Sequence, residues 1–133
     1  MELVKLKKAI TSAISNLEHS LQALLKRDEE GLLSYVWWAA ADSEYALFLL
    51  FIMHKETLER SSWNSSFHQK KVEVGPSLVC ARDNLKEAKK NIEANDLNNA
   101  HKKTWLARGC LLKVQDIFEK ERGSDKKSFL TPT

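Results

Sequence analysis

The first part of the chain carries apolar residues at steps of three and four, the spacing of one face of an α-helix. The run is Leu3, Leu6, Ile10, Ala13, Leu17, Leu21 and Leu24. It predicts a helix over residues 2–27. Lys26 and Arg27 place cations at its C-terminal end, and three acidic residues from Asp28 onward place anions at the start of the next segment, as helix dipoles favour. The short separation predicts an antiparallel hairpin with the following helix.

The next segment, Leu32 to Met53, is apolar on nearly every side of a helix, with Asp42, Ser43 and Glu44 at its centre. A helix of this kind belongs in a membrane, in a protein core or in a subunit interface. In a membrane, two carboxylates would lie at the middle of the bilayer, which is costly. We therefore expect the helix to be surrounded by protein.

We expect this second helix to cover residues 29–60, a length of ~45 Å at about 1.5 Å per residue, which is more than one small bundle needs. The face assigned to the core carries Leu33, Trp37, Ala40, Glu44, Leu47, Phe51 and Leu58. The face assigned to a homodimer interface includes Asp42, and its apolar members are Tyr35, Trp38, Tyr45, Leu49 and Ile52. Leaving those side chains in water would forfeit several kcal/mol, so the sequence predicts a homodimer.

Residues 61–75 collect Ser and Asn and show no helical period, so they predict one long connection. Trp63, Phe67 and His68 are expected to anchor it to the bundle. Pro76 then opens a third helix, because proline is tolerated in a first turn. The narrow apolar seam of this helix is Leu78, Ala81, Leu85, Ala88 and Ile92.

A fourth helix follows a break at Asn95, with Asp96 as its N-cap and an end near Arg122. Its seam is Leu97, Ala100, Thr104, Ala107, Leu111, Val114 and Phe118. Gly123 stops the helix, and residues 124–133 predict a flexible tail.

These elements predict an all-α fold, a four-helix up-and-down bundle of two antiparallel hairpins joined by a long loop. A length of 133 residues suits one domain, assigned to residues 1–123, with the tail at 124–133. Four glycines, two prolines and 43% hydrophobic residues fit a helical protein.

Charge and targeting signals add few constraints. The net charge of +3, from 21 basic and 18 acidic residues, neither requires nor excludes a polyanionic partner. The first residues lack the continuous apolar core and small-residue cleavage site of a secretory signal, so we expect a cytoplasmic protein.

No motif in the sequence identifies a reaction. The Glu-x-x-His pattern of metal-binding bundles is absent, and the four histidines have no clear ligand spacing, so we expect neither a metal nor a cofactor. Gly-rich phosphate loops and the Gly-x-Ser-x-Gly nucleophile turn are also absent from the sequence. These absences favour a non-enzymatic protein, and they leave an enzyme open as an alternative.

Asp42 and Glu44 are the strongest polar candidates, because a carboxylate in apolar surroundings is costly unless it is paired. They lie about 200° apart around a helix axis and cannot act together as acid and base in one chain. Glu44 is the first candidate for a buried functional residue, in a ligand pocket with Trp37, Phe48 and Phe51. The alternative is that Glu44 pairs with a basic group or a hydroxyl and fixes the helix register.

The two cysteines lie equally far along the chain from Asn95. A hairpin that folds at Asn95 places Cys80 and Cys110 at the same height, each one residue beside the seam. They form a possible thiol pair, which a cytoplasmic protein would normally keep reduced.

Basic residues flank the same turn and form a candidate nucleic-acid surface. They are Lys86, Lys89, Lys90, His101, Lys102 and Lys103, with Trp105 as a platform for stacking on a base. Acidic residues interleave with them, and such alternation is typical of a solvated helix face. The leading hypothesis is therefore a helical interaction module that self-associates through the helix at 29–60, ahead of a ligand pocket around Glu44 and a nucleic-acid interface.

Overall fold

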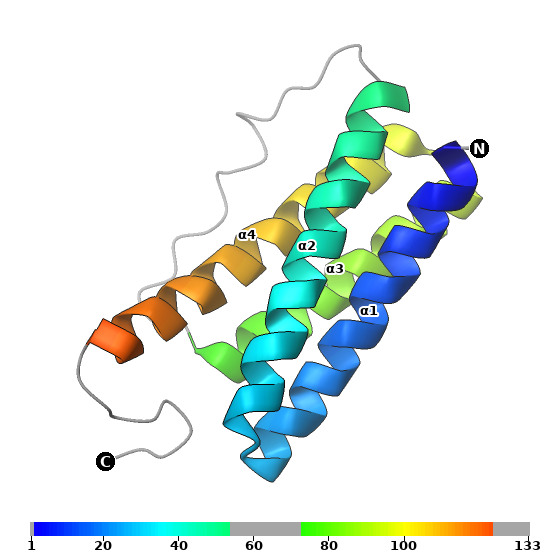
Figure 1. Ribbon diagram of the computed structural model, residues 1–133. Coiled ribbons are helices and arrows are strands. Elements are labelled where there is room, and N and C mark those ends of the chain that lie inside the picture. Colours follow the sequence, from blue (N-terminus) through cyan, green and yellow to red (C-terminus); the bar gives the residue numbers. More distant parts are fainter. Residues whose placement is uncertain (1, 54–72, 124–133) are drawn as a thin grey trace.

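The computed structural model describes residues 2–53 and 73–123 and places them in four α-helices (Figure 1). Their bounds are α1 Glu2–Lys26, α2 Glu29–Met53, α3 Val74–Glu93 and α4 Leu97–Gly123. The predicted fold class is confirmed, because α1 packs on α2 and α3 packs on α4 as two antiparallel hairpins. α3 starts at Val74, before the expected end of the connection at Gly75, so Pro76 lies within its first turn.

Several expectations fall on residues outside those described. They are the last turns of the second helix at 54–60, the connection from residue 61 to 72 with Trp63, Phe67 and His68, and the tail at 124–133.

Each helix packs against two neighbours, since α1 also contacts α3 and α2 also contacts α4. The start of α3 lies beside the end of α1, where a Cβ on Gly75 would be 3.5 Å from Leu24 Cδ2. Neighbouring helices are therefore antiparallel throughout (Figure 1). Consequently α2 and α3, which follow one another in the chain, point the same way across a diagonal, and the end of α2 and the start of α3 lie at opposite ends of the bundle.

Both hairpins turn by the same device. One residue of each turn has a left-handed backbone. It is Arg27, directly after α1, with φ 59°, and Asn95, the second residue after α3, with φ 60°. The next residue donates its amide back to the helix, from Asp28 to Ala23 O at 2.8 Å and from Asp96 to Asn91 O at 2.7 Å. This is the Schellman arrangement, which satisfies carbonyls that a helix end leaves open.

The same two aspartates then cap the following helices. Asp28 Oδ1 accepts the amide of Gly31 at 3.0 Å, and Asp96 Oδ1 accepts the amide of Asn99 at 3.2 Å. Each cap satisfies an amide that the first turn leaves open, so the predicted N-cap at Asp96 is confirmed. A C-terminal motif followed directly by an N-cap keeps the turns short, with two residues at 27–28 and three at 94–96, and fixes the register of both hairpins.

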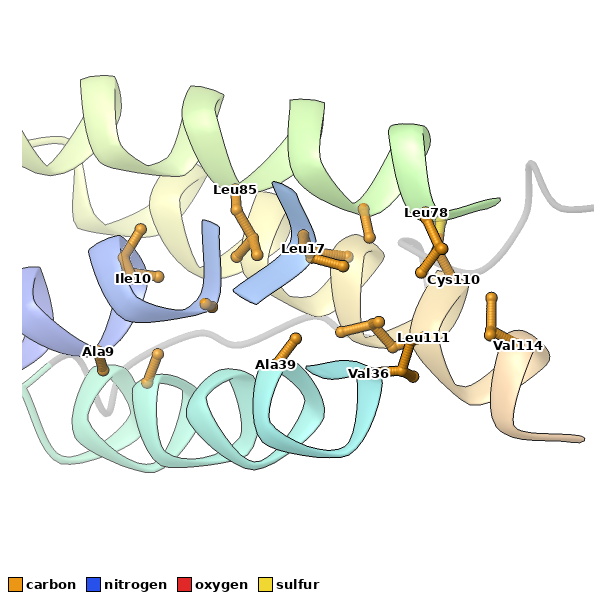
Figure 2. Close-up of a cluster of buried hydrophobic side chains, with 14 of the residues drawn as sticks. Ala9, Ile10, Leu17, Val36, Ala39, Leu78, Leu85, Cys110, Leu111 and Val114 are labelled. Atoms are coloured by element: carbon orange, nitrogen blue, oxygen red, sulfur yellow. The ribbon is translucent and has the colours of Figure 1, made fainter. Parts of the chain in front are cut away.

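The core contains the apolar seams of all four helices (Figure 2). The predicted seam of α3 is buried throughout, and that of α4 is buried from Ala100 to Phe118. α1 buries most of its predicted stripe, whereas Leu3 at its start is exposed. Figure 2 shows side chains of Ile10 and Leu17 from α1, Val36 from α2 and Leu111 from α4 converging between the helices.

The expected core face of α2 is wrong for several residues. The buried set is Leu32, Val36, Ala39, Ser43, Ala46, Leu47, Leu49 and Leu50. Trp37, Glu44 and Phe51, assigned to the core, are exposed. The physical reason is that α2 is apolar on all sides, so the spacing of its apolar residues does not identify the inward face. The side that packs in the core is the one with small and aliphatic residues, because these permit close contact between helices.

Candidate functional site

The side of α2 that points away from the bundle is a continuous apolar surface, which we call the outer face. It consists of Trp37, Trp38, Ala41, Glu44, Tyr45, Phe48, Phe51 and Ile52, all exposed. The exposed fractions of its large apolar members are 66% for Trp37, 56% for Trp38, 45% for Tyr45, 57% for Phe48, 48% for Phe51 and 39% for Ile52. Polar groups would be expected on the solvent side of a bundle helix, so this side of α2 needs a separate explanation.

The outer face repeats with the period of a helix–helix contact. Trp38, Ala41, Tyr45, Phe48 and Ile52 alternate steps of three and four residues, the a and d positions of a heptad. Trp37, Glu44 and Phe51 run beside them at steps of seven residues. Both spacings can be seen in the sequence. Because the helix is apolar on all sides, however, the sequence does not show which apolar stripe faces the core.

Two residues expected at the interface belong to the bundle itself. Leu49 is buried in the core at 4% exposure, so its assignment to the interface is wrong. Tyr35 is half-buried and stacks on His19 of α1, with ring centroids 5.1 Å apart. Trp38, Tyr45 and Ile52 lie on the outer face, and Trp37, Phe48 and Phe51 join them there.

Asp42 and Glu44 point to opposite sides of α2, as their spacing predicts. Asp42 Oδ2 accepts hydrogen bonds from Ser12 Oγ at 2.6 Å and from Asn16 Nδ2 at 3.0 Å, both on α1. Ser12 and Asn16 were missed by the sequence analysis, because a residue on another helix leaves no local signal in the pattern around Asp42. The three polar groups satisfy one another at the α1–α2 contact and fix its register.

Glu44 is not a buried residue, which corrects the expectation drawn from its apolar neighbours. Its side chain is 52% exposed and pairs with Arg108 of α4 through an Nε–Oε2 contact of 2.5 Å. The Arg108 guanidinium also lies 5.1 Å from the ring centre of Trp105. The alternative expectation, pairing of Glu44 with a basic group, therefore describes the structure, and an exposed pair of this kind contributes ~1 kcal/mol or less.

A groove between α2 and α4 lies beside this ion pair. Its lining is Glu44, Leu47, Phe48, Phe51, Trp105 and Arg108. Three of the four residues predicted around a ligand pocket therefore line it, whereas Trp37 does not. The groove is open to solvent and shares Phe48 and Phe51 with the outer face, so it forms one edge of that surface.

A second open groove lies between α1 and α2 and has a polar lining. It is formed by Lys7, Lys8, Thr11, Ser12, Ser15, Asn16, His19 and Tyr35. The sequence pattern does not indicate this groove, because its residues lie on the solvated side of the α1 stripe and form no recognised motif.

The basic residues around the α3–α4 turn do not form a single surface. His101 is fully buried, so it cannot contact a phosphate backbone and its assignment is wrong. Lys86 Nζ lies 3.5 Å from Glu18 Oε2 of α1, and Trp105 has Arg108 against its ring. Lys90 and Lys102 are exposed, and Lys89 and Lys103 are half-buried. Ion pairing and burial thus remove much of the surface that a nucleic acid would need.

The two cysteines come together as the hairpin geometry suggests. Cys110 Sγ lies 3.1 Å from Cys80 Sγ, and both are free thiols. Among residues 2–53 and 73–123, no group of three or more His, Cys, Asp or Glu side chains is arranged to hold a metal ion.

Within those same ranges, α2 is the one helix long and apolar enough to cross a membrane by length and composition. Core helices of soluble proteins meet the same criterion, and 39% of its apolar window is buried against the other helices, so this is weak evidence for a span.

Comparisons of the chain with models of known protein families, with curated proteins and with solved structures give no match. Function must therefore be argued from the surfaces of the bundle itself.

Proposed function

We propose that this protein is a helical interaction module that self-associates through the outer face of α2. The observation that carries the proposal is the concentration of exposed aromatic side chains on that one face. At about 200 Å² per large side chain, these exposed fractions amount to on the order of 600 Å² of apolar surface. That is at the upper end for a monomer and approaches the ~800 Å² per partner of a standard interface.

The partner proposed is a second copy of the chain, and the electrostatics support this choice. Glu44 is the one charged residue of the outer face, and Arg108 of the same chain already pairs with it. The surface thus carries no unpaired charge that would call for a charged partner. A nearly neutral aromatic face is self-complementary, as a two-fold contact requires, because the same patch must face itself.

The heptad spacing suggests how the two copies meet. In an antiparallel pair of α2 helices, a positions face d positions, which sets Trp38 opposite Phe48 of the second copy and Ala41 opposite Tyr45. The small side chain at Ala41 gives room for the large ring of Tyr45. The contacts of Ala41 with Tyr45 then lie at the centre of the interface, and one layer of Trp38 and Phe48 lies on each side of them.

Trp38→Glu tests the proposal by placing a charge in an aromatic layer of the contact, opposite Phe48 of the second copy. Leu25→Glu is the matched control, because Leu25 is 84% exposed and belongs to α1, outside the outer face. We expect wild type and Leu25→Glu to sediment as dimers and Trp38→Glu to sediment as a folded monomer with unchanged helical circular dichroism. Equal masses for the two variants would overturn the proposal.

A further inference from the structure

Cys80 and Cys110, the two cysteines of the chain, touch across the α3–α4 contact. The thiol of Cys110 donates to Cys80 Sγ over 3.1 Å. A disulfide bond is about 2.05 Å long, so the two sulfur atoms need to move together by about 1 Å to bond. Figure 2 shows Cys110 of α4 beside Leu78 of α3, inside the packed contact between these helices.

The two thiols differ in their hydrogen bonds. Cys80 Sγ accepts from the Cys110 thiol and from Asn84 Nδ2, which lies 3.4 Å away and also donates to Cys80 O at 3.0 Å. Hydrogen bonds donated to a sulfur atom stabilise its thiolate. Cys80 is also half-buried, whereas Cys110 is 2% exposed. Cys80 is therefore the sulfur that a small reagent can reach, and it accepts hydrogen bonds from two neighbouring side chains.

Cys110 keeps its proton. Burial raises the pKa of Cys110 from 9.0 to about 12, helped by the hydrogen bond and the charge of Cys80 and opposed by Lys113. Two of these causes come from Cys80 and disappear once the Cys80 sulfur is part of a neutral disulfide. The two thiols therefore react in a fixed order. Cys80 reacts first, and Cys110 becomes easier to ionise afterwards.

We propose that Cys80 and Cys110 form a reactive dithiol that exchanges with small-molecule disulfides and closes to a reversible disulfide between α3 and α4. The Cys80 thiolate attacks one sulfur of the small disulfide, forming a mixed disulfide and releasing one small thiolate. Cys110 gives up its proton and attacks Cys80 Sγ, and the second small thiolate leaves. The two protons of the protein thiols end on the two released thiols, so the protein is oxidised by two electrons and the small disulfide is reduced by two.

Glutathione redox buffers test the proposal on the full chain. After equilibration, acid quenching and alkylation, we expect intact wild-type protein to have lost two hydrogen atoms and to carry neither glutathione nor alkyl groups. The fold should favour the bond, so the equilibrium constant for closure should be on the order of a hundredfold higher in the folded chain than in concentrated guanidinium chloride.

Single-cysteine variants separate the two roles. Cys110→Ser should stop at the mixed disulfide and gain one glutathione on Cys80. Folded Cys80→Ser should react at least about a hundredfold more slowly, because the remaining thiol is buried and protonated. Asn84→Ala should slow alkylation of Cys80 several-fold in the Cys110→Ser background, whereas Asn98→Ala, at an exposed position on α4, should not change it.

Three results would overturn the proposal. They are two free thiols in wild-type protein under oxidising glutathione, equal closure in the folded and denatured chains, and equal rates for Cys80→Ser and Cys110→Ser. The dithiol lies on α3 and α4, away from the outer face of α2, so reduced and oxidised protein should have the same solution mass. A failure here therefore leaves the self-association proposal unaffected.

Discussion

The inner and outer faces of α2 are both apolar, yet they are built from different side chains. The inner face carries Val36, Ala39, Ala46 and Leu50, which are small or aliphatic and fully buried. The outer face carries five aromatic rings, all exposed. Small side chains allow four helices to approach closely, whereas large rings need a separate surface to cover them. The comparison indicates that one face builds the bundle and the other serves an association.

The largest expected effect comes from truncating the inner face. Leu50→Ala should lower the free energy of unfolding by about 3 kcal/mol, because it removes a fully buried side chain and leaves a cavity. Phe51→Ala, at the next residue but on the outer face, should cost less than about 1 kcal/mol. Urea denaturation in the monomeric Trp38→Glu background measures both values without a contribution from association. Equal losses would end the distinction between the faces.

A charge-swap experiment tests which residues of the outer face meet in the dimer. Trp38→Glu and Phe48→Lys should each raise the dimer dissociation constant by more than about 30-fold, since each removes an aromatic anchor worth roughly 2 kcal/mol or more. Mixed together, they should form a heterodimer in which the introduced Glu and Lys face each other at one pair of positions and the native contact of Phe48 with Trp38 remains at the other. The heterodimer would be seen as a gain in mass by light scattering. Failure of the mixture to associate would exclude the antiparallel register.

A smaller effect is expected at the capped start of α2, which sets the angle at which both faces are presented. Asp28→Ala should lower the free energy of unfolding by about 1 kcal/mol, because the Gly31 amide loses its acceptor. Asp96→Ala should cost a similar amount at the other hairpin, where the same motif recurs. Thermal unfolding of the two variants compares the stability that each cap contributes. An Asp28→Ala variant with the stability of wild type would mean that this cap contributes nothing.

The smallest effect is expected at the ion pair beside the outer face. A double-mutant cycle of Glu44→Gln and Arg108→Gln should give a coupling energy of about 1 kcal/mol or less, because the Glu44 side chain is half exposed. Urea denaturation at low and high salt measures it. A coupling several times larger would show that the pair is shielded from water, which favours an enclosed ligand site at the α2–α4 groove.

The sequence predicts the buried face of a helix well when that helix has one apolar face and one polar face, and poorly when it does not. α3 and α4 have narrow apolar seams on polar helices, so their buried faces could be identified, and the equal spacing of the cysteines from Asn95 predicted their approach. The turn residues Asp28 and Asp96 also carry a local signal. In each case the helix carries a single apolar stripe, or the turn carries a single side chain suited to capping, so the sequence allows one assignment.

The same reasoning fails on α2. Its apolar residues surround the helix, so Glu44 was assigned to the core and Leu49 to the interface, whereas the structure exposes the first and buries the second. Pairing across helices is also beyond a single pattern, as the hydrogen bonds from Ser12 and Asn16 to Asp42 illustrate. The orientation of one hairpin against the other, which sets these contacts, depends on packing of the whole bundle.

Self-association through the outer face is tested most simply by the solution mass of the wild-type chain, measured by light scattering over a wide range of protein concentration. We expect twice the monomer mass of 15.2 kDa at high concentration, falling toward 15.2 kDa on dilution. Salt should change the transition little, because the outer face is held by apolar contacts. A mass of 15.2 kDa at every concentration would contradict the claim that the outer face of α2 is a self-association surface.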